Sequence, residues 1–475
     1  MTLTPVQQSA YDDIRGKLDT SGWFNPVSHG EVNDVASRLR GLSAADADAV
    51  IDEMQRTGEL DRLASEAVDG SWFGNGGYSD SERRELFADL AGKLDGDSLA
   101  AVHRAFTGAT SGEDEYGKVG ELADAIATHA SPQAKLDYVR SIAGDTADGQ
   151  GLSGTTFGGS WSREVDGEAQ AVGKVIGSLQ GAYAEQALSS LNREQLGAVL
   201  RTGVDQSNWY SEGGVVTGFD PAGFQRVMDA AASTGNADLK ARVFDAGADV
   251  LRTVRDTQGV GLGQNSPDRN ETLAAVRDSM TKLLDSDTAG ITRELTYNTE
   301  TQDGSDLGAY AQVMIATGQE AKLGEQMAKL QFGNDMQGDP IARLNETVDV
   351  NGQARRENAG ALGYFTGAVY AGAAAHSSDI KTQQEVTTAV LKSALTVIDK
   401  AGVGGRIGGT VASVGKEWVQ FAVRAAIADP GATPAQKLER AALPQDPRTG
   451  ELGIGDDVAN AFNTTLSRVQ RTADP

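Results

Sequence analysis

The stretch Gly70-Ser-Trp72-Phe73-Gly-Asn-Gly-Gly77 is one of four similar phrases, in which a tryptophan follows a glycine, serine or asparagine. The other three are Ser21-Gly-Trp23-Phe24, Gly159-Ser-Trp161-Ser162 and Ser207-Asn-Trp209-Tyr210. The four tryptophans are one, two and one steps of about 47 residues apart, and a constant step of that size is typical of stacked helical units. We therefore predict an all-α fold of repeated helical hairpins, about 45–50 residues each, with glycine- and tryptophan-containing loops.

Helical periodicity supports this prediction. Residues 31–42 and 44–57 each place their apolar side chains on one stripe, which marks a buried helix face. The two stripes are Val32, Val35, Leu39 and Leu42, and Ala47, Val50, Ile51 and Met54. Helix starts are expected at Thr4-Pro5, Ser79, Ser131-Pro132 and Asp220-Pro221, where a capping oxygen or a proline suits the first turn.

Four of the expected helices end at a Thr-Gly pair, with their glycines at Gly58, Gly203, Gly235 and Gly318. Glycine in the left-handed conformation ends a helix at low cost, so each pair predicts a tight corner between two helices. Strand signals are weak: the segments 151–161 and 213–218 predict short β-hairpins within loops.

Three regions follow from changes in composition. We predict an N-terminal helical repeat region over residues 1–258 and a C-terminal helical bundle with small-residue apolar helices over 259–428. Five of the eleven prolines lie between Pro430 and Pro475, so residues 429–475 are expected to form a proline-rich linker followed by a terminal helix.

The composition excludes several kinds of site. The 475 residues include no cysteine, which rules out disulfides, thiolate metal ligands and cysteine nucleophiles, and only four histidines, none paired at helical spacing. A net charge of −25 disfavours binding to nucleic acid, because the phosphates are negatively charged too. No phosphate-binding loop is present, and the glycine-rich stretch 402–409 lacks the dinucleotide-binding spacing. We expect no metal and no cofactor.

Hydrolytic chemistry needs only two carboxylates, and Glu82 with Glu85 offers a weak candidate pair. They lie at helical spacing just after the Trp72 phrase, where an aromatic loop beside carboxylates could serve a carbohydrate or peptidoglycan hydrolase. The alternative is that Ser79 and Glu82 form a capping box at the start of a solvated helix. Both interpretations stay open.

The aromatic residues near the loops have two interpretations as well. Trp72, Phe73, Tyr78, Trp209 and Tyr210 could contact a protein partner, because exposed aromatic side chains often dominate interfaces. Alternatively the tryptophans fold back and fill the seams between helical units.

Residues 358–378 form the longest uncharged stretch, with a length that could cross a bilayer. Gly363 and Gly367 have the spacing that allows close helix contact in lipid, and Phe365 and Tyr370 are the neighbouring aromatic candidates for membrane contact. The alternative is a central helix buried on all sides by its neighbours. Of the two, we favour burial of residues 358–378 inside the protein over contact with a membrane.

Three phrases carry a family resemblance: Trp72-Phe-Gly-Asn-Gly-Gly-Tyr-Ser-Asp-Ser-Glu-Arg83, Ala127-Thr-His-Ala-Ser-Pro-Gln-Ala-Lys135 and Glu357-Asn-Ala-Gly-Ala-Leu-Gly-Tyr-Phe365. In these the chain resembles the helical, cysteine-free modules of secreted effector and polymorphic-toxin proteins of proteobacteria. The resemblance implies export and action on another cell.

The N-terminal residues have no basic and apolar regions of a signal peptide, so we expect secretion by a signal-peptide-independent route, or a bacterial cytoplasmic location. The leading functional prediction is a secreted effector or toxin-associated protein that acts by protein binding or membrane contact, since no catalytic motif is present. The alternatives are the hydrolase and an acidic intracellular scaffold.

Overall fold

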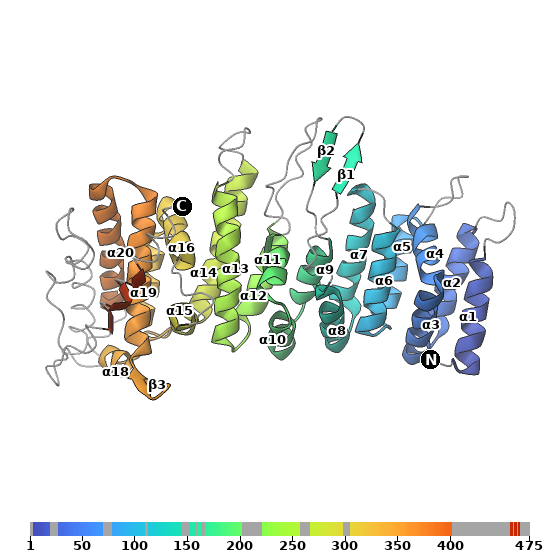
Figure 1. Cartoon of the computed structure of the whole chain (residues 1–475), viewed down its shortest axis with the longest axis horizontal. Helices are drawn as coiled ribbons and strands as arrows, with labels where there is room; N and C mark the ends of the chain where they lie inside the picture. The colour runs from blue at the N-terminus through green and yellow to red at the C-terminus, as the bar shows by residue number, and fades with distance from the viewer. Residues whose placement is uncertain are drawn as a thin grey trace. The chain divides into compact units, whose positions relative to one another are not determined.

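The computed structural model describes residues 3–19, 27–69, 78–109, 113–144, 153–156, 159–162, 167–201, 221–256, 267–297, 305–400, 457–458, 460–462 and 464–465. These residues are predominantly helical, so the protein is all-α, as predicted (Figure 1). Two short antiparallel hairpins, β1 (Ser153–Thr156) with β2 (Gly159–Ser162) and β3 (Val348–Val350) with β4 (Gln353–Arg355), complete the described secondary structure.

The chain divides into two compact units, Met1–Thr234 and Gly235–Pro475. Unit 1 contains the helices α1 (Pro5–Lys17), α2 (His29–Gly41), α3 (Ala44–Thr57), α4 (Glu59–Asp69), α5 (Asp80–Ala91), α6 (Gly96–Gly108), α7 (Glu113–His129), α8 (Pro132–Ala143), α9 (Gly167–Ile176), α10 (Gly181–Ser189), α11 (Arg193–Arg201) and α12 (Ala222–Ala232).

Unit 2 contains α13 (Ala237–Asp256), α14 (Pro267–Ser286), α15 (Thr288–Tyr297), α16 (Ser305–Ala316), α17 (Glu320–Phe332), α18 (Pro340–Asn345), α19 (Glu357–His376) and α20 (Ile380–Lys400). Helix α13 belongs to unit 2 because it packs against α14, α15 and α16. The predicted region boundaries at 258/259 and 428/429 lie outside the described residues.

In unit 1 the helices pack in two rows. In the first row each helix contacts the next in the order α2, α5, α7, α9 and α12. In the second row the order is α4, α6, α8 and α10. Helices α2 and α5 run in the same direction, since His29 meets Glu82 near their starts and Arg40 meets Asp89 near their ends. The starts of the first row, at residues 29, 80, 113, 167 and 222, are unevenly spaced. The repeat of about 45–50 residues therefore stays a prediction.

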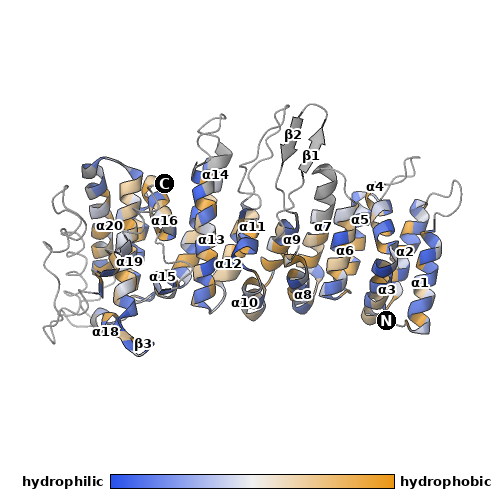
Figure 2. Ribbon diagram, in the orientation of Figure 1, coloured by the Kyte–Doolittle hydropathy of each residue, from blue (hydrophilic) through white to orange (hydrophobic). Residues whose placement is uncertain are grey.

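The local start signals are confirmed at three sites. Thr4 and Ser79 form capping boxes with Gln7 and Glu82, and the Ser131 hydroxyl accepts a hydrogen bond from the N–H of Ala134. The two predicted apolar stripes of α2 and α3 are buried, including Leu42 just after α2. In Figure 2 most helices carry both hydrophilic and hydrophobic residues, as expected for helices with one buried face.

The Thr-Gly corners are confirmed only in part. Gly58 and Gly318 adopt φ values of +89° and +70°, the left-handed conformation expected there. Gly235 has no positive φ, because α12 already ends at Ala232 and is capped by the backbone of Ser233. Of the predicted hairpins, residues 153–162 form β1 and β2, whereas Gly203 and the segment 213–218 lie outside the described residues.

Helix backbones approach each other closely at a glycine in both units. A Cβ added at Gly96, the first residue of α6, would overlap the backbone nitrogen of Tyr138 and lie 2.5 Å from the oxygen of Ala134 in α8. Likewise a Cβ at Gly324 of α17 would lie 2.6 Å from the backbone nitrogen of Ala394 in α20. Both pairs of helices touch through their backbones.

We expect Gly96→Ala to destabilise unit 1 by about 1–3 kcal/mol, because the added methyl group must push α6 away from α8. The matched control is Gly16→Ala in α1, where a Cβ meets nothing within 4 Å; it should be neutral, or stabilise by up to about 1 kcal/mol. Urea unfolding followed by circular dichroism measures both. A Gly96→Ala chain as stable as the parent would contradict the close packing.

Candidate functional site

In the sequence, the Trp72 phrase at residues 70–77 lies between α4 and α5, and the start of α5 follows it closely. Of the five predicted partner-contact residues, Trp72, Phe73, Trp209 and Tyr210 lie outside the described residues, and Tyr78 is described. Tyr78 comes two residues before α5, and its neighbours are the first residues of α2 and α5. We call Tyr78, Glu82, Glu85, His29 and Arg40 the α2–α5 junction.

Tyr78 is an anchor of this junction. The residue is only 7% exposed, and its ring meets the His29 ring edge to face with centroids 5.8 Å apart. Burial, followed by the nearby Glu82 carboxylate, raises the pKa of its hydroxyl, so Tyr78 is a neutral phenol near neutral pH. Its hydroxyl is buried and has no hydrogen-bond partner among the described residues. The ring thus packs where α2 and α5 begin, and its role in partner contact stays a prediction.

Glu82 acts as the capping carboxylate of α5. It accepts hydrogen bonds from the Ser79 hydroxyl at 2.6 Å and the Ser79 N–H at 3.0 Å, and its carboxylate lies 3.1 Å from His29 Nε2. These bonds lower the pKa of the Glu82 carboxyl from its ordinary 4.5 to about 2. A general acid needs a raised pKa, so this geometry favours the capping interpretation over the catalytic one.

Glu85 lies one turn further along α5 and faces α2. Its carboxylate pairs with Arg40 at 3.1 Å, and the same guanidinium binds Asp89 at 2.5 Å. Both carboxylates of the predicted pair are therefore engaged with α2, through His29 and Arg40 respectively. The arrangement joins two parallel helices along their length.

Arg83 is a buried residue of this region whose role the sequence reasoning missed. Its side chain is 3% exposed and donates to Glu121 of α7 at 2.9 Å and to Asp80 at 2.8 Å. Arg84 reaches the other oxygen of Glu121 at 2.8 Å. The Arg83-Arg84 pair is visible in the sequence, but only the packing of α5 on α7 shows its carboxylate partner.

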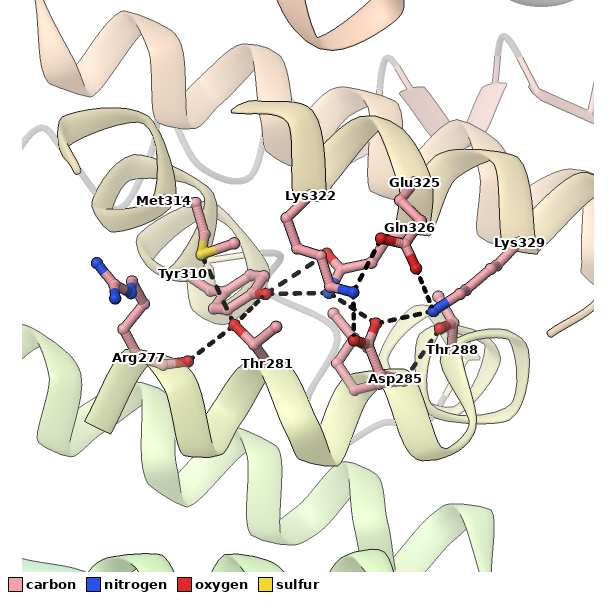
Figure 3. A network of polar contacts seen from close by, with 11 residues as sticks. Arg277, Thr281, Asp285, Thr288, Tyr310, Met314, Lys322, Glu325, Gln326 and Lys329 are labelled. Atoms are coloured by element: carbon pink, nitrogen blue, oxygen red, sulfur yellow. Dashed lines mark hydrogen bonds and ion pairs between the residues drawn. The ribbon is translucent and has the colours of Figure 1, made fainter. Parts of the chain in front are cut away.

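A second polar cluster joins α14, α16 and α17 in unit 2 (Figure 3). The Asp285 carboxylate pairs with the ammonium groups of Lys322 and Lys329, with N···O distances of 2.7 and 3.3 Å. The Glu325 carboxylate pairs with the same two lysines at 2.9 and 2.8 Å. Gln326 donates to the buried Tyr310 hydroxyl at 3.0 Å, and this hydroxyl also lies 2.9 Å from Thr281.

The charges of this unit 2 cluster balance. Burial lowers the pKa of Lys322, but the hydrogen bonds to Asp285 and Glu325 outweigh it, so the net pKa is raised. Burial likewise raises the pKa of Glu325, and the bonds from Lys329 and Lys322 outweigh it, so the net pKa is lowered. Lys322 and Glu325 thus stay charged, and each is paired with oppositely charged neighbours. The cluster fits a staple between helices better than a reactive centre.

The candidate membrane residues lie in α19, inside unit 2. Gly363, Phe365 and Gly367 are buried, and Tyr370 is partly buried against Phe462, with ring centroids 6.2 Å apart. Helices α15, α16, α17 and α20 all pack against α19. No helix within the described ranges has both the length and the hydropathy to cross a membrane. These contacts support the buried-helix interpretation.

Comparison with known proteins adds no family. No family model matches the chain, and no curated protein is significantly similar to it. Within the part of the chain that the structure describes, no group of three or more histidine, aspartate or glutamate side chains could hold a metal ion.

We expect Ser79→Ala to destabilise unit 1 by about 1 kcal/mol, because the α5 cap loses its hydroxyl and Glu82 loses a hydrogen bond. Ser81→Ala, two residues later and also exposed, removes a hydroxyl that contacts the Ser79 hydroxyl but does not cap the helix, and it should change stability by less than about 0.5 kcal/mol. Thermal unfolding of the two variants and the parent measures the difference. Equal melting temperatures for the two variants would argue against the cap.

The lowered pKa of Glu82 predicts a pH dependence. Because its folded pKa, about 2, lies below the ordinary 4.5, the ionised carboxylate adds stability that is fully present above pH 4.5. That stability is lost as the pH falls from 4.5 towards 2. The difference in unfolding free energy between the parent and Glu82→Gln should therefore be constant from pH 6 to 8 and shrink at pH 4 and 3. Glu85→Gln controls for removing a carboxylate that makes no cap. A difference that grows in acid would contradict the assignment.

Proposed function

We propose that this protein acts by binding another protein, and that the segment carrying Trp72 and Phe73 contacts the partner. The observation that supports the proposal most directly is the α2–α5 junction. It holds Tyr78 and the start of α5, the helix that follows residues 70–77, through the ring contact with His29 and through the Glu82 cap. A rigid support lowers the entropy cost of presenting an aromatic contact, so it suits a binding site.

The Trp209 segment extends the same proposal. Residues 202–220 connect α11 to α12, and α12 belongs to the same row of helices as α2 and α5. In this view Trp209 and Tyr210 form a second contact of the same kind. The net charge of −25 favours a partner with a basic surface.

The setting we propose is that of a bacterial secreted effector or toxin-associated protein. Its support is the resemblance of the Trp72, Ala127–Lys135 and Glu357–Phe365 phrases to effector modules, together with the absence of cysteine. Export without a signal peptide is part of this proposal.

Neither alternative is favoured by a specific observation. The hydrolase would need Glu82 or Glu85 as a proton donor, whereas both carboxylates are engaged with α2, and Glu82 is ionised near neutral pH. The acidic scaffold would also act by protein binding, so it differs from the secreted effector in cellular location rather than in mechanism.

The test is site-specific photo-crosslinking in cells that produce the full chain. A photoreactive amino acid at position 72 or 209 should capture the same partner, whereas the exposed positions Ser9 and Ala44, in α1 and α3, should not. Capture of the same proteins from all four positions would contradict the proposal.

Affinity for the captured partner then tests the tryptophan directly. Trp72→Ala should weaken binding by at least about tenfold, since tryptophans at interface centres commonly contribute this much. Tyr183→Ala, which removes an aromatic side chain of α10 that is 37% exposed, is the matched control and should leave the Kd unchanged. Equal losses for both variants would count against a contact at Trp72.

A further inference from the structure

One face of α19 is covered by a segment from far along the chain. The described residues between 457 and 465 are helical and lie beside α19, where Figure 1 draws them in dark red. Residues 459 and 463 fall outside the described set. The buried side chains are Val458, Phe462 and Thr465, whereas Asn460 and Thr464 are exposed. This spacing is that of a helix with a single apolar face.

The segment meets α19 at its two spaced glycines. A Cβ added at Gly363 would overlap the carbonyl oxygen of Val458 and lie 3.0 Å from Ala461 Cβ. At Gly367 it would lie 3.0 Å from both the Phe462 oxygen and Thr465 Cβ. The glycines therefore form a shallow groove, in which the backbone of another helix can rest against α19.

Side chains at the two ends complete the contact. Tyr370 packs against Phe462, and Arg356, just before α19, pairs with Asp457 at 3.1 Å. The Arg356 and Asp457 side chains are 29% and 38% exposed, so water screens this ion pair and it holds the segment only weakly.

The opposite side of α19 is held differently. A Cβ at Gly372 would lie 2.7 Å from the backbone nitrogen of Gln312 and 2.9 Å from Ala311 Cβ, so α16 is in close contact there. Gly360, which shares the face of Gly363 and Gly367 one turn earlier, closely approaches the Tyr297 hydroxyl of α15. Both α15 and α16 also pack against α13, whereas the 457–465 segment presents one narrow apolar face to α19.

We propose that residues 457–465 form a displaceable strap, whose release exposes on α19 a groove that binds an amphipathic helix. The groove is lined by Gly363, Gly367 and Tyr370, and its occupant in the closed state is the chain's own strap. A helix that fits the groove has the pattern of the strap. It needs an acidic residue that pairs with Arg356, an aromatic ring that packs on Tyr370 and a small residue at Gly367. In the strap these are Asp457, Phe462 and Thr465. This inference does not depend on a partner at Trp72.

Single introduced thiols test whether the strap opens, because the chain has no cysteine of its own. Thr465 is 1% exposed and Ala311 0% exposed, so Thr465→Cys and Ala311→Cys are both buried in the closed protein. Thr465→Cys should react with a maleimide at least about tenfold faster than Ala311→Cys, since local opening needs less free energy than unfolding of the unit. Rates in urea give the intrinsic reactivity of each thiol. Equal protection of the two would overturn the proposal.

A residue that blocks the groove separates strap release from unfolding. Gly363→Leu should speed labelling of Thr465→Cys by at least about a further tenfold and leave Ala311→Cys unchanged, because only the strap is displaced. Ala374→Leu, at an exposed position of the same helix, should change neither rate. If Gly363→Leu speeds both thiols equally, the strap is an integral part of the core and the proposal fails.

Binding in trans tests the groove itself. A fluorescent peptide with the sequence of residues 456–471 should bind a full-length Phe462→Asp chain, in which a charge displaces the built-in strap. Adding Gly367→Leu to that chain should abolish binding, whereas adding Ala374→Leu should not. Failure of the peptide to bind, or equal binding to all three chains, would refute the groove.

Discussion

Close contact between helix backbones is the constraint on which the rest of this structure depends. Leucine, valine and a few aromatic side chains fill the core, but several helix pairs meet at a glycine. Gly96 brings α6 onto α8, Gly324 brings α17 onto α20, and Gly372 brings α19 onto α16. Dispersion between closely packed backbone atoms then replaces the contacts that bulky side chains would make.

Polar side chains connect neighbouring helices at several points. Glu82 and His29 join α5 to α2, Arg83 and Glu121 join α5 to α7, and the Asp285 cluster joins α14 to α17. In each case opposite charges or hydrogen-bonding groups satisfy one another. The described polar clusters thus connect helices, whereas the contacts that we propose for a partner are the Trp72 and Trp209 segments and the α19 groove.

Signals that act within one helical turn were readable in the sequence. The capping boxes at Thr4 and Ser79 need only residues three apart, and the left-handed glycines at Gly58 and Gly318 follow from local backbone preference. Gly235 shows the limit of such reading, because α12 ends earlier on the backbone of Ser233. For the candidate site, Glu82 and Glu85 could be named as a pair, but their engagement with His29 and Arg40 could not, since those partners lie on another helix.

The sequence by itself determined that the protein is helical, where several helices begin, and which faces of α2 and α3 are buried, because each depends on periodicity or on capping within a few residues. Three features needed the tertiary structure: α7 rather than the next helix in sequence, α6, packs beside α5; Arg83 is buried against Glu121; and Gly363 and Gly367 of α19 face Val458, Phe462 and Thr465. These are contacts between residues far apart in the chain, and no local preference specifies which helix will meet which.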